Sequence, residues 1–225
     1  MSVTQILQSF NSRNYRLFFS GQSLSMIGSF MIETTCAWLV YYLTKSVALL
    51  GLVGFLYQVP NLIVSPLAGV RIEQFNRRNI LIAVQFFMMI ISLTLAIIAL
   101  KGIISIWQII CASILQGFLS SVETPARYAF IMDIIEKKED ITNATAIDSS
   151  LLSGSRIIAP AMPTAASYAG IIIANLSPRH CFLIDGISYI AIISALLAIK
   201  VNKLATFIKV KFYFINQITT QEDAV

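Results

Sequence analysis

Long apolar runs alternate with short polar stretches along most of the chain. A hydrocarbon core about 30 Å thick requires roughly 20 apolar residues per helix, and several runs meet this requirement. We expect six membrane helices, at Leu17–Leu43, Leu49–Ala68, Ile80–Leu100, Ile103–Ser121, Ala144–Ala166 and Cys181–Ile199. Because most connections between these runs are short, successive helices should run antiparallel and pack as one bundle.

The composition agrees with this pattern. Hydrophobic residues make up 57% of the 225 residues and charged residues only 12%, a balance typical of integral membrane proteins. The net charge of +5 does not indicate nucleic-acid binding, because the basic residues lie at the ends of apolar runs and not on one polar face. We therefore predict an all-α membrane protein that has the lipid bilayer, and no nucleic acid, as a partner.

The basic residues predict the orientation of the bundle. Twelve of the sixteen fall at alternate connections that would share one side of the membrane, and three fall on the opposite side. Since Lys and Arg are retained on the cytoplasmic side, we expect a multi-pass protein of the plasma (inner) membrane with both termini cytoplasmic. The twelve are Arg13, Arg16, Arg71, Arg77, Arg78, Arg127, Lys137, Lys138, Lys200, Lys203, Lys209 and Lys211, and the three are Lys45, Lys101 and Arg179.

The six runs divide into two sets of three that carry prolines at similar positions. Pro60 and Pro66 lie in the second run, and Pro160 and Pro163 lie at equivalent positions in the fifth. Such weak internal symmetry is typical of transporters built from repeats, and it predicts a 3+3 arrangement. Prolines that only kink the helices for packing would give the same pattern.

Small residues predict one helix contact. They gather on the first and fifth runs, where they would let two backbones approach closely. We therefore expect the first and fifth helices to pack together. The residues are Gly21, Ser25, Gly28 and Ser29 on the first run, and Ser149, Ser150, Ser153, Gly154 and Ser155 on the fifth.

Two charges fall deep inside the predicted helices. Glu33 and Arg156 lie near the bilayer middle, where an ionisable group is costly and usually functional. We interpret them as facing a polar interior, either as an ion pair or as separate contacts to substrate or protons. A purely structural pair is the alternative. Asp148 and Asp185 lie closer to their helix ends, where they could reach the interface or cap a turn.

The sequence contains few of the residues and motifs that are typical of enzyme active sites. His180 is the only histidine, the three cysteines are isolated, and no glycine-rich phosphate loop is present. We therefore expect no enzymatic activity, no metal site and no cofactor.

The stretch from Pro66 to Arg78 resembles the loop signature of the major facilitator superfamily between its second and third helices. Gly69, Glu73, Arg77 and Arg78 fall on the main positions of that signature, with Glu73 in place of the usual Asp. The resemblance implies an alternating-access carrier in which this charged hinge locks a cytoplasmic gate.

Other stretches resemble the exporter subgroup that contains enterobactin and macrolide exporters. They begin at Asn14, Ala37 and Glu123. In the fifth run, Ser155, Ala159 and Pro160 fall within a stretch similar to the antiporter signature of exporters, with Ala159 where Gly is usual. The resemblance implies proton-coupled efflux of a small molecule such as a drug or siderophore. It also implies gate contacts for Glu73 and Arg77, and similar contacts for Glu123 and Arg127 below the fourth helix.

The resemblance extends over about residues 10–199, whereas the family normally has twelve helices. We expect residues 1–199 to form the N-terminal six-helix bundle and residues 200–225 to form a cytoplasmic tail. Two hypotheses follow. The chain is half of an exporter that a second six-helix half or self-association completes, or it is a membrane remnant that does not transport.

Overall fold

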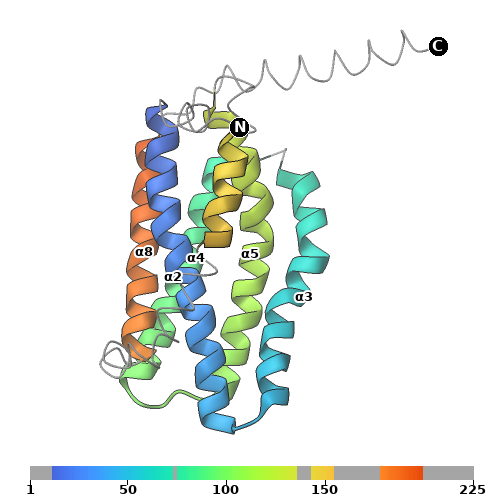
Figure 1. Ribbon diagram of the computed structural model, residues 1–225, viewed down its shortest axis with the longest axis vertical. Coiled ribbons are helices and arrows are strands. Elements are labelled where there is room, and N and C mark those ends of the chain that lie inside the picture. Colours follow the sequence, from blue (N-terminus) through green and yellow to red (C-terminus); the bar gives the residue numbers. More distant parts are fainter. Residues whose placement is uncertain (1–11, 73–74, 136–142, 155–177, 200–225) are drawn as a thin grey trace, which may run out of the picture.

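The computed structural model describes residues 12–72, 75–135, 143–154 and 178–199. These ranges fold as an elongated bundle of helices (Figure 1). The helices are α2 (Arg13–Thr44), α3 (Val47–Ile72), α4 (Arg77–Leu100), α5 (Ile106–Ile134), α8 (Pro178–Ala198) and a shorter helix over residues 143–154. The described part of the chain contains no strand, and the predicted all-α membrane fold is confirmed.

Helices that follow one another in the chain run in opposite directions. Figure 1 shows that α2 and α4 begin at the end of the bundle where α3, α5 and α8 finish. We call this end the basic end, because Arg13, Arg16, Arg71, Arg77 and Arg78 lie there.

Five helices are long and apolar enough to cross a membrane: α2, α3, α4, α5 and α8. The chain is therefore a multi-pass membrane protein, and five of the six expected spans are found. The remaining span, Ala144–Ala166, is described only as far as residue 154.

The fourth membrane helix is longer than its hydropathy indicates. We expected it to end at Ser121, but α5 continues to Ile134. Glu123 and Arg127 therefore lie on the helix itself, and the prediction that they lie below it is wrong. The helix accommodates both charges because each finds polar partners elsewhere in the bundle.

The small residues of α2 face α8. A Cβ atom added to Gly21 would lie 3.0 Å from the Cα of Ile192, and one added to Gly28 would lie 2.8 Å from Oδ1 of Asp185. These small residues therefore contact α8 and not the described part of the fifth run, although the two helices do meet where the Tyr15 hydroxyl donates a 3.2 Å hydrogen bond to the carbonyl oxygen of Ala144. The rest of the fifth run, residues 155–166, lies outside the described residues. The serines that we expected opposite the small residues of α2 are exposed and donate hydrogen bonds to carbonyls of their own helix: Ser149, Ser150 and Ser153.

A second close approach joins α3 to α5. A Cβ atom added to Gly117 of α5 would collide with the carbonyl oxygen of Tyr57 on α3. Glycine at this position lets the two backbones touch, as small residues do at helix contacts in membranes.

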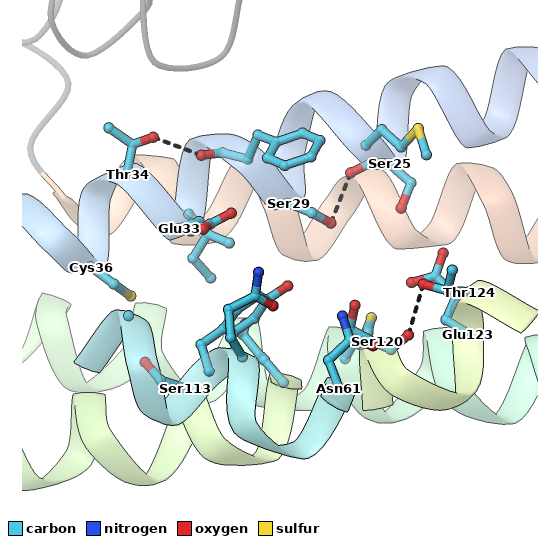
Figure 2. A pocket seen from close by; sticks show the side chains of 18 of the residues that line it. Ser25, Ser29, Glu33, Thr34, Cys36, Asn61, Ser113, Ser120, Glu123 and Thr124 are labelled. Atoms are coloured by element: carbon cyan, nitrogen blue, oxygen red, sulfur yellow. Dashed lines mark hydrogen bonds between the residues drawn. The ribbon is translucent and has the colours of Figure 1, made fainter. Parts of the chain in front are cut away.

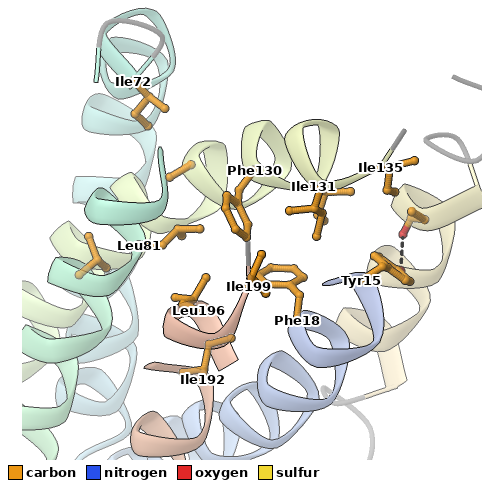
Figure 3. Close-up of a cluster of buried hydrophobic side chains, with 14 of the residues drawn as sticks. Tyr15, Phe18, Ile72, Leu81, Phe130, Ile131, Ile135, Ile192, Leu196 and Ile199 are labelled. Carbon is orange, nitrogen blue, oxygen red and sulfur yellow. Dashed lines mark hydrogen bonds between the residues drawn. The ribbon is translucent and has the colours of Figure 1, made fainter. Parts of the chain in front are cut away.

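Two clusters of buried apolar side chains fill the bundle. The cluster at the basic end includes Phe18, Phe130 and Leu196, which come from α2, α5 and α8 (Figure 3). The second cluster includes Ile109 and Phe182. Large apolar side chains also cover the outside of the helices, as expected for a surface that faces lipid; Leu62 of α3, for example, is 80% exposed.

Candidate functional site

A polar cavity of about 600 Å³ lies among α2, α3 and α5, and Tyr189 of α8 also reaches its wall (Figure 2). Hollows of this size with a few polar groups are typical of small-molecule sites. The charged lining residues are Glu33, Glu123 and Arg127. The other polar lining residues are Gln22, Ser25, Ser29, Thr34, Tyr57, Gln58, Asn61, Ser113, Gln116, Ser120, Thr124 and Tyr189.

Glu33 lines this cavity from the inner part of α2 (Figure 2). It is exposed, so its carboxylate is accessible from the cavity. Its expected partner Arg156 lies outside the described residues, and the pairing stays a prediction. The antiporter-like residues Ser155, Ala159 and Pro160 also lie outside the described residues.

Glu123 connects three helices at the cavity wall. Its Oε1 atom accepts one hydrogen bond from Nε2 of Gln22 on α2 and another from Nε2 of Gln85 on α4, each at 3.2 Å. Two amide donors stabilise the carboxylate within the membrane-spanning bundle. Neither glutamine is conspicuous in the sequence, because a lone Gln in an apolar run carries no signal of its partner.

Arg127, one turn beyond Glu123 on α5, faces Asp148 on the helix over residues 143–154. Its Nε atom lies 3.8 Å from Oδ2 of Asp148, and both side chains are almost fully buried. Neither of these two atoms makes a hydrogen bond within the described residues. The pair is therefore a weaker contact than a hydrogen-bonded ion pair, although both side chains are buried. The suggestion that Asp148 reaches the interface is wrong, since only 2% of this residue is exposed.

The glutamine at position 116 adds an amide side chain to the same cavity. Gln116 is 8% exposed, and its Nε2 atom has no hydrogen-bond partner among the described residues. A buried amide without a partner is costly, but less than 1 Å² of this nitrogen is accessible, so it reaches a molecule in the cavity only when the side chain changes rotamer.

Arg77, a residue of the predicted gate motif, joins α4 to α5 at the basic end. Its Nη1 atom lies 2.6 Å from Oδ1 of Asp133 and 3.3 Å from the carbonyl oxygen of Ala129. Asp133 was missed in the sequence, because it was grouped with the charged connection that follows. Each charge lies at the helix end where the macrodipole has the same sign, and the ion pair offsets both unfavourable placements.

Arg78 joins α4 to α8. Its Nη2 atom donates a hydrogen bond of 2.8 Å to the carbonyl oxygen of Leu197, near the end of α8. A cation at this position pairs with a terminal carbonyl that lacks an intrahelical partner.

Of the two remaining motif positions, only Gly69 lies among the described residues. Gly69 lies in α3 with no described atom within 4 Å of the place where its Cβ would be. Glu73 lies outside the described residues. The described ranges hold no group of three His, Cys, Asp or Glu side chains suited to a metal ion.

Comparison with known proteins gives a family. The model of the transmembrane secretion effector family matches residues 4–212. The staphyloferrin A transporter of Staphylococcus aureus is 30% identical over 192 residues, which cover 84% of this chain and 47% of that protein. Macrolide efflux protein A of Streptococcus pyogenes is 24% identical over 156 residues, which cover 66% of this chain and 38% of that protein.

The chain therefore spans about half the length of these curated relatives or less. No solved structure matches it significantly. The family match runs through every described helix. The chain belongs to the transmembrane secretion effector family of the major facilitator superfamily.

Proposed function

We propose that this chain forms one half of a secondary active exporter and supplies one wall of its substrate site. The observation that carries this proposal is the cavity with polar lining residues that lies among helices long and apolar enough to cross the membrane. Glu123 and Arg127 give the wall both signs of charge, and Gln116 adds an amide side chain. These groups suit a polar or amphipathic small molecule, which agrees with relatives named for siderophore transport and macrolide efflux.

A second six-helix unit supplies the opposite wall in this proposal. The chain spans about half of its relatives, and Glu33 is exposed on the cavity side of α2. The second unit is either a further polypeptide or another copy of this chain.

The basic end forms the cytoplasmic gate in this proposal. The excess of Lys and Arg there favours a cytoplasmic position in the inner membrane, with both termini on that side. The contacts of Arg77 with Asp133 and of Arg78 with Leu197 hold α4, α5 and α8 together at this end. A carrier that alternates between two open states must rearrange packed helices at such a point.

Coupling to protons completes the proposal. Glu33 lies on the cavity side, where it can take up a proton when substrate leaves. Efflux would then follow the inward movement of protons.

The test is efflux from bacteria that lack their own exporters. Cells expressing this chain alone, this chain with a second six-helix half, or neither are loaded with a radiolabelled macrolide or with staphyloferrin A, and retention is measured over time. We expect faster loss of at least one compound with both halves, and slower loss when a protonophore is added. Gln116→Leu should reduce that loss, whereas Leu62→Ala on the lipid-facing surface should not. Equal retention in all three strains would contradict the proposal and support the membrane remnant.

A further inference from the structure

Asp185 is a buried carboxylate that the cavity and the gate leave unexplained. It lies in the second turn of α8 and has no exposed surface. The expectation that it reaches the interface is wrong. Its Oδ1 atom lies against the backbone of α2, where a Cβ on Gly28 would be 2.8 Å away. The absence of a side chain at position 28 therefore creates the space that Asp185 occupies.

The surroundings of Asp185 contain no positive charge among the described residues. The ionisable groups that interact electrostatically with Asp185 are Cys36 on α2, Tyr57 on α3 and Tyr189 on α8 itself. Ser92 is its polar neighbour on α4. All of these groups are neutral or negative, so none compensates an ionised Asp185.

The hydrogen bonds around Asp185 are equally sparse. Neither Oδ1 nor Oδ2 has a hydrogen-bond partner of good geometry within the described residues. The nearby hydroxyl of Ser92 donates instead to the carbonyl oxygen of Phe182, at 2.9 Å. An isolated carboxylate without a cation or donors is too costly to keep ionised inside a membrane, whereas its protonated form carries no net charge.

A route for that proton starts at Tyr189, one turn further along α8. The hydroxyl of Ser29 donates to the carbonyl oxygen of Ser25 at 3.0 Å, so its remaining capacity toward Tyr189 is as an acceptor. The hydroxyl of Tyr189 therefore donates to Ser29 at 3.0 Å. The lone pairs of the Tyr189 hydroxyl oxygen can then accept a hydrogen bond from the protonated carboxyl group of Asp185, which lies beside it.

The last two members of this chain of hydroxyls open onto the cavity. Tyr189 and Ser29 both line it, whereas Asp185 lies behind the wall. We propose that Asp185 is a proton-binding site that exchanges its proton with the cavity through the hydroxyls of Tyr189 and Ser29. Its use in transport rests on the proposed function, but proton binding itself can be measured without transport.

The first experiment is infrared spectroscopy of the full chain reconstituted in lipid vesicles. A protonated carboxyl group has a C=O absorption separate from that of a carboxylate, and labelling the side-chain carboxyl of aspartate with a heavy carbon isotope shifts only the aspartate signal. We expect a protonated-aspartate band at neutral pH in the unaltered protein. Asp185→Asn should abolish it, whereas Glu33→Gln and Asp148→Asn should retain it.

The second experiment follows the shift of this band after transfer to heavy water. Tyr189→Phe and Ser29→Ala should slow the exchange several-fold, because each removes a hydroxyl from the route. Ser150→Ala is the matched control, since Ser150 is exposed and bonds only within its own helix in the described structure. It should exchange at the rate of the unaltered protein.

Two results would overturn the proposal. One is the absence of a protonated-aspartate band in the unaltered protein, as would occur if a cation from outside the described residues kept Asp185 ionised. The other is equal exchange rates in Tyr189→Phe, Ser29→Ala and the control. The isotope shift in the unaltered protein does not depend on any variant folding, and neither readout depends on export.

Discussion

Two ion pairs in the described part of the bundle join the same kinds of side chain but differ in their geometry. Arg77 and Asp133 meet at 2.6 Å, and Arg77 also binds the carbonyl oxygen of Ala129. Arg127 and Asp148 are more deeply buried, yet their closest charged atoms are 3.8 Å apart and lack hydrogen bonds among the described residues. In the first pair, which we call saturated, hydrogen bonds fix two helices to each other. In the second, which we call unsaturated, the closest charged atoms lack hydrogen bonds among the described residues and can exchange partners. The saturated pair lies at the basic end, and the unsaturated pair borders the cavity.

The largest expected effect comes from breaking the short pair. Asp133→Ala leaves the Arg77 guanidinium largely buried without its carboxylate, and we expect a loss of about 3–5 kcal/mol in the free energy of unfolding in detergent. The exchanged double variant Arg77→Asp with Asp133→Arg should recover much of this loss, because each charge then lies at a helix end of opposite sign. A loss in Asp133→Ala no greater than in an exposed substitution such as Ser149→Ala would contradict this interpretation.

Breaking the long pair should cost less. We expect Asp148→Asn to reduce the free energy of unfolding by about 2 kcal/mol, since no hydrogen bond between the closest charged atoms is lost. The guanidinium of Arg127 keeps its place over the ring of Tyr128, 5.5 Å from the ring centre. Chemical denaturation in the same detergent measures this, with Ser153→Ala on the same helix as the control. An effect equal to that of Asp133→Ala would remove the distinction between the pairs.

The amides that bind Glu123 provide an intermediate case. Gln22→Leu and Gln85→Leu should each cost about 1 kcal/mol, because the other amide still donates to the carboxylate. The double variant should cost more than the sum, which a double-mutant cycle would measure. Gln58→Leu, at an exposed position of the same cavity, is the control. Strict additivity would mean that the two bonds are independent.

The smallest effect concerns Arg78. Its single bond to Leu197 lies near a helix end, and Arg78→Gln should cost about 0.5 kcal/mol, less at high salt. Arg78→Lys keeps the positive charge near the end of α8 and should recover part of that loss. Thermal melting at low and high salt measures both variants, and an effect of Arg78→Gln that does not change with salt would contradict the electrostatic explanation.

Hydropathy predicted the membrane helices because lipid imposes a minimum length of apolar chain. It failed at Ser121, since Glu123 and Arg127 look like a boundary until Gln22, Gln85 and Asp148 are placed beside them. Spacing along the chain identified Gly21 and Gly28 as a contact surface, but it does not carry the identity of the partner helix.

Some residues of the candidate site could likewise be predicted from the sequence, and others could not. Glu33 could be identified as unusual because a carboxylate in an apolar run is conspicuous by itself. The burial of Asp185 and the free donor of Gln116 depend on neighbours distant in sequence, so no local pattern predicts them. Asp133 was missed for the opposite reason, since the charges that follow it made it look like part of a solvated loop.

The contact at Gly117 limits how the cavity can change shape. With the carbonyl oxygen of Tyr57 occupying the space of the missing side chain, α3 cannot approach α5 further or rotate against it without a backbone collision. Movements that bring α3 closer to α5 are therefore excluded, and a change of cavity shape on this side requires α3 to move away from α5 or to move together with it.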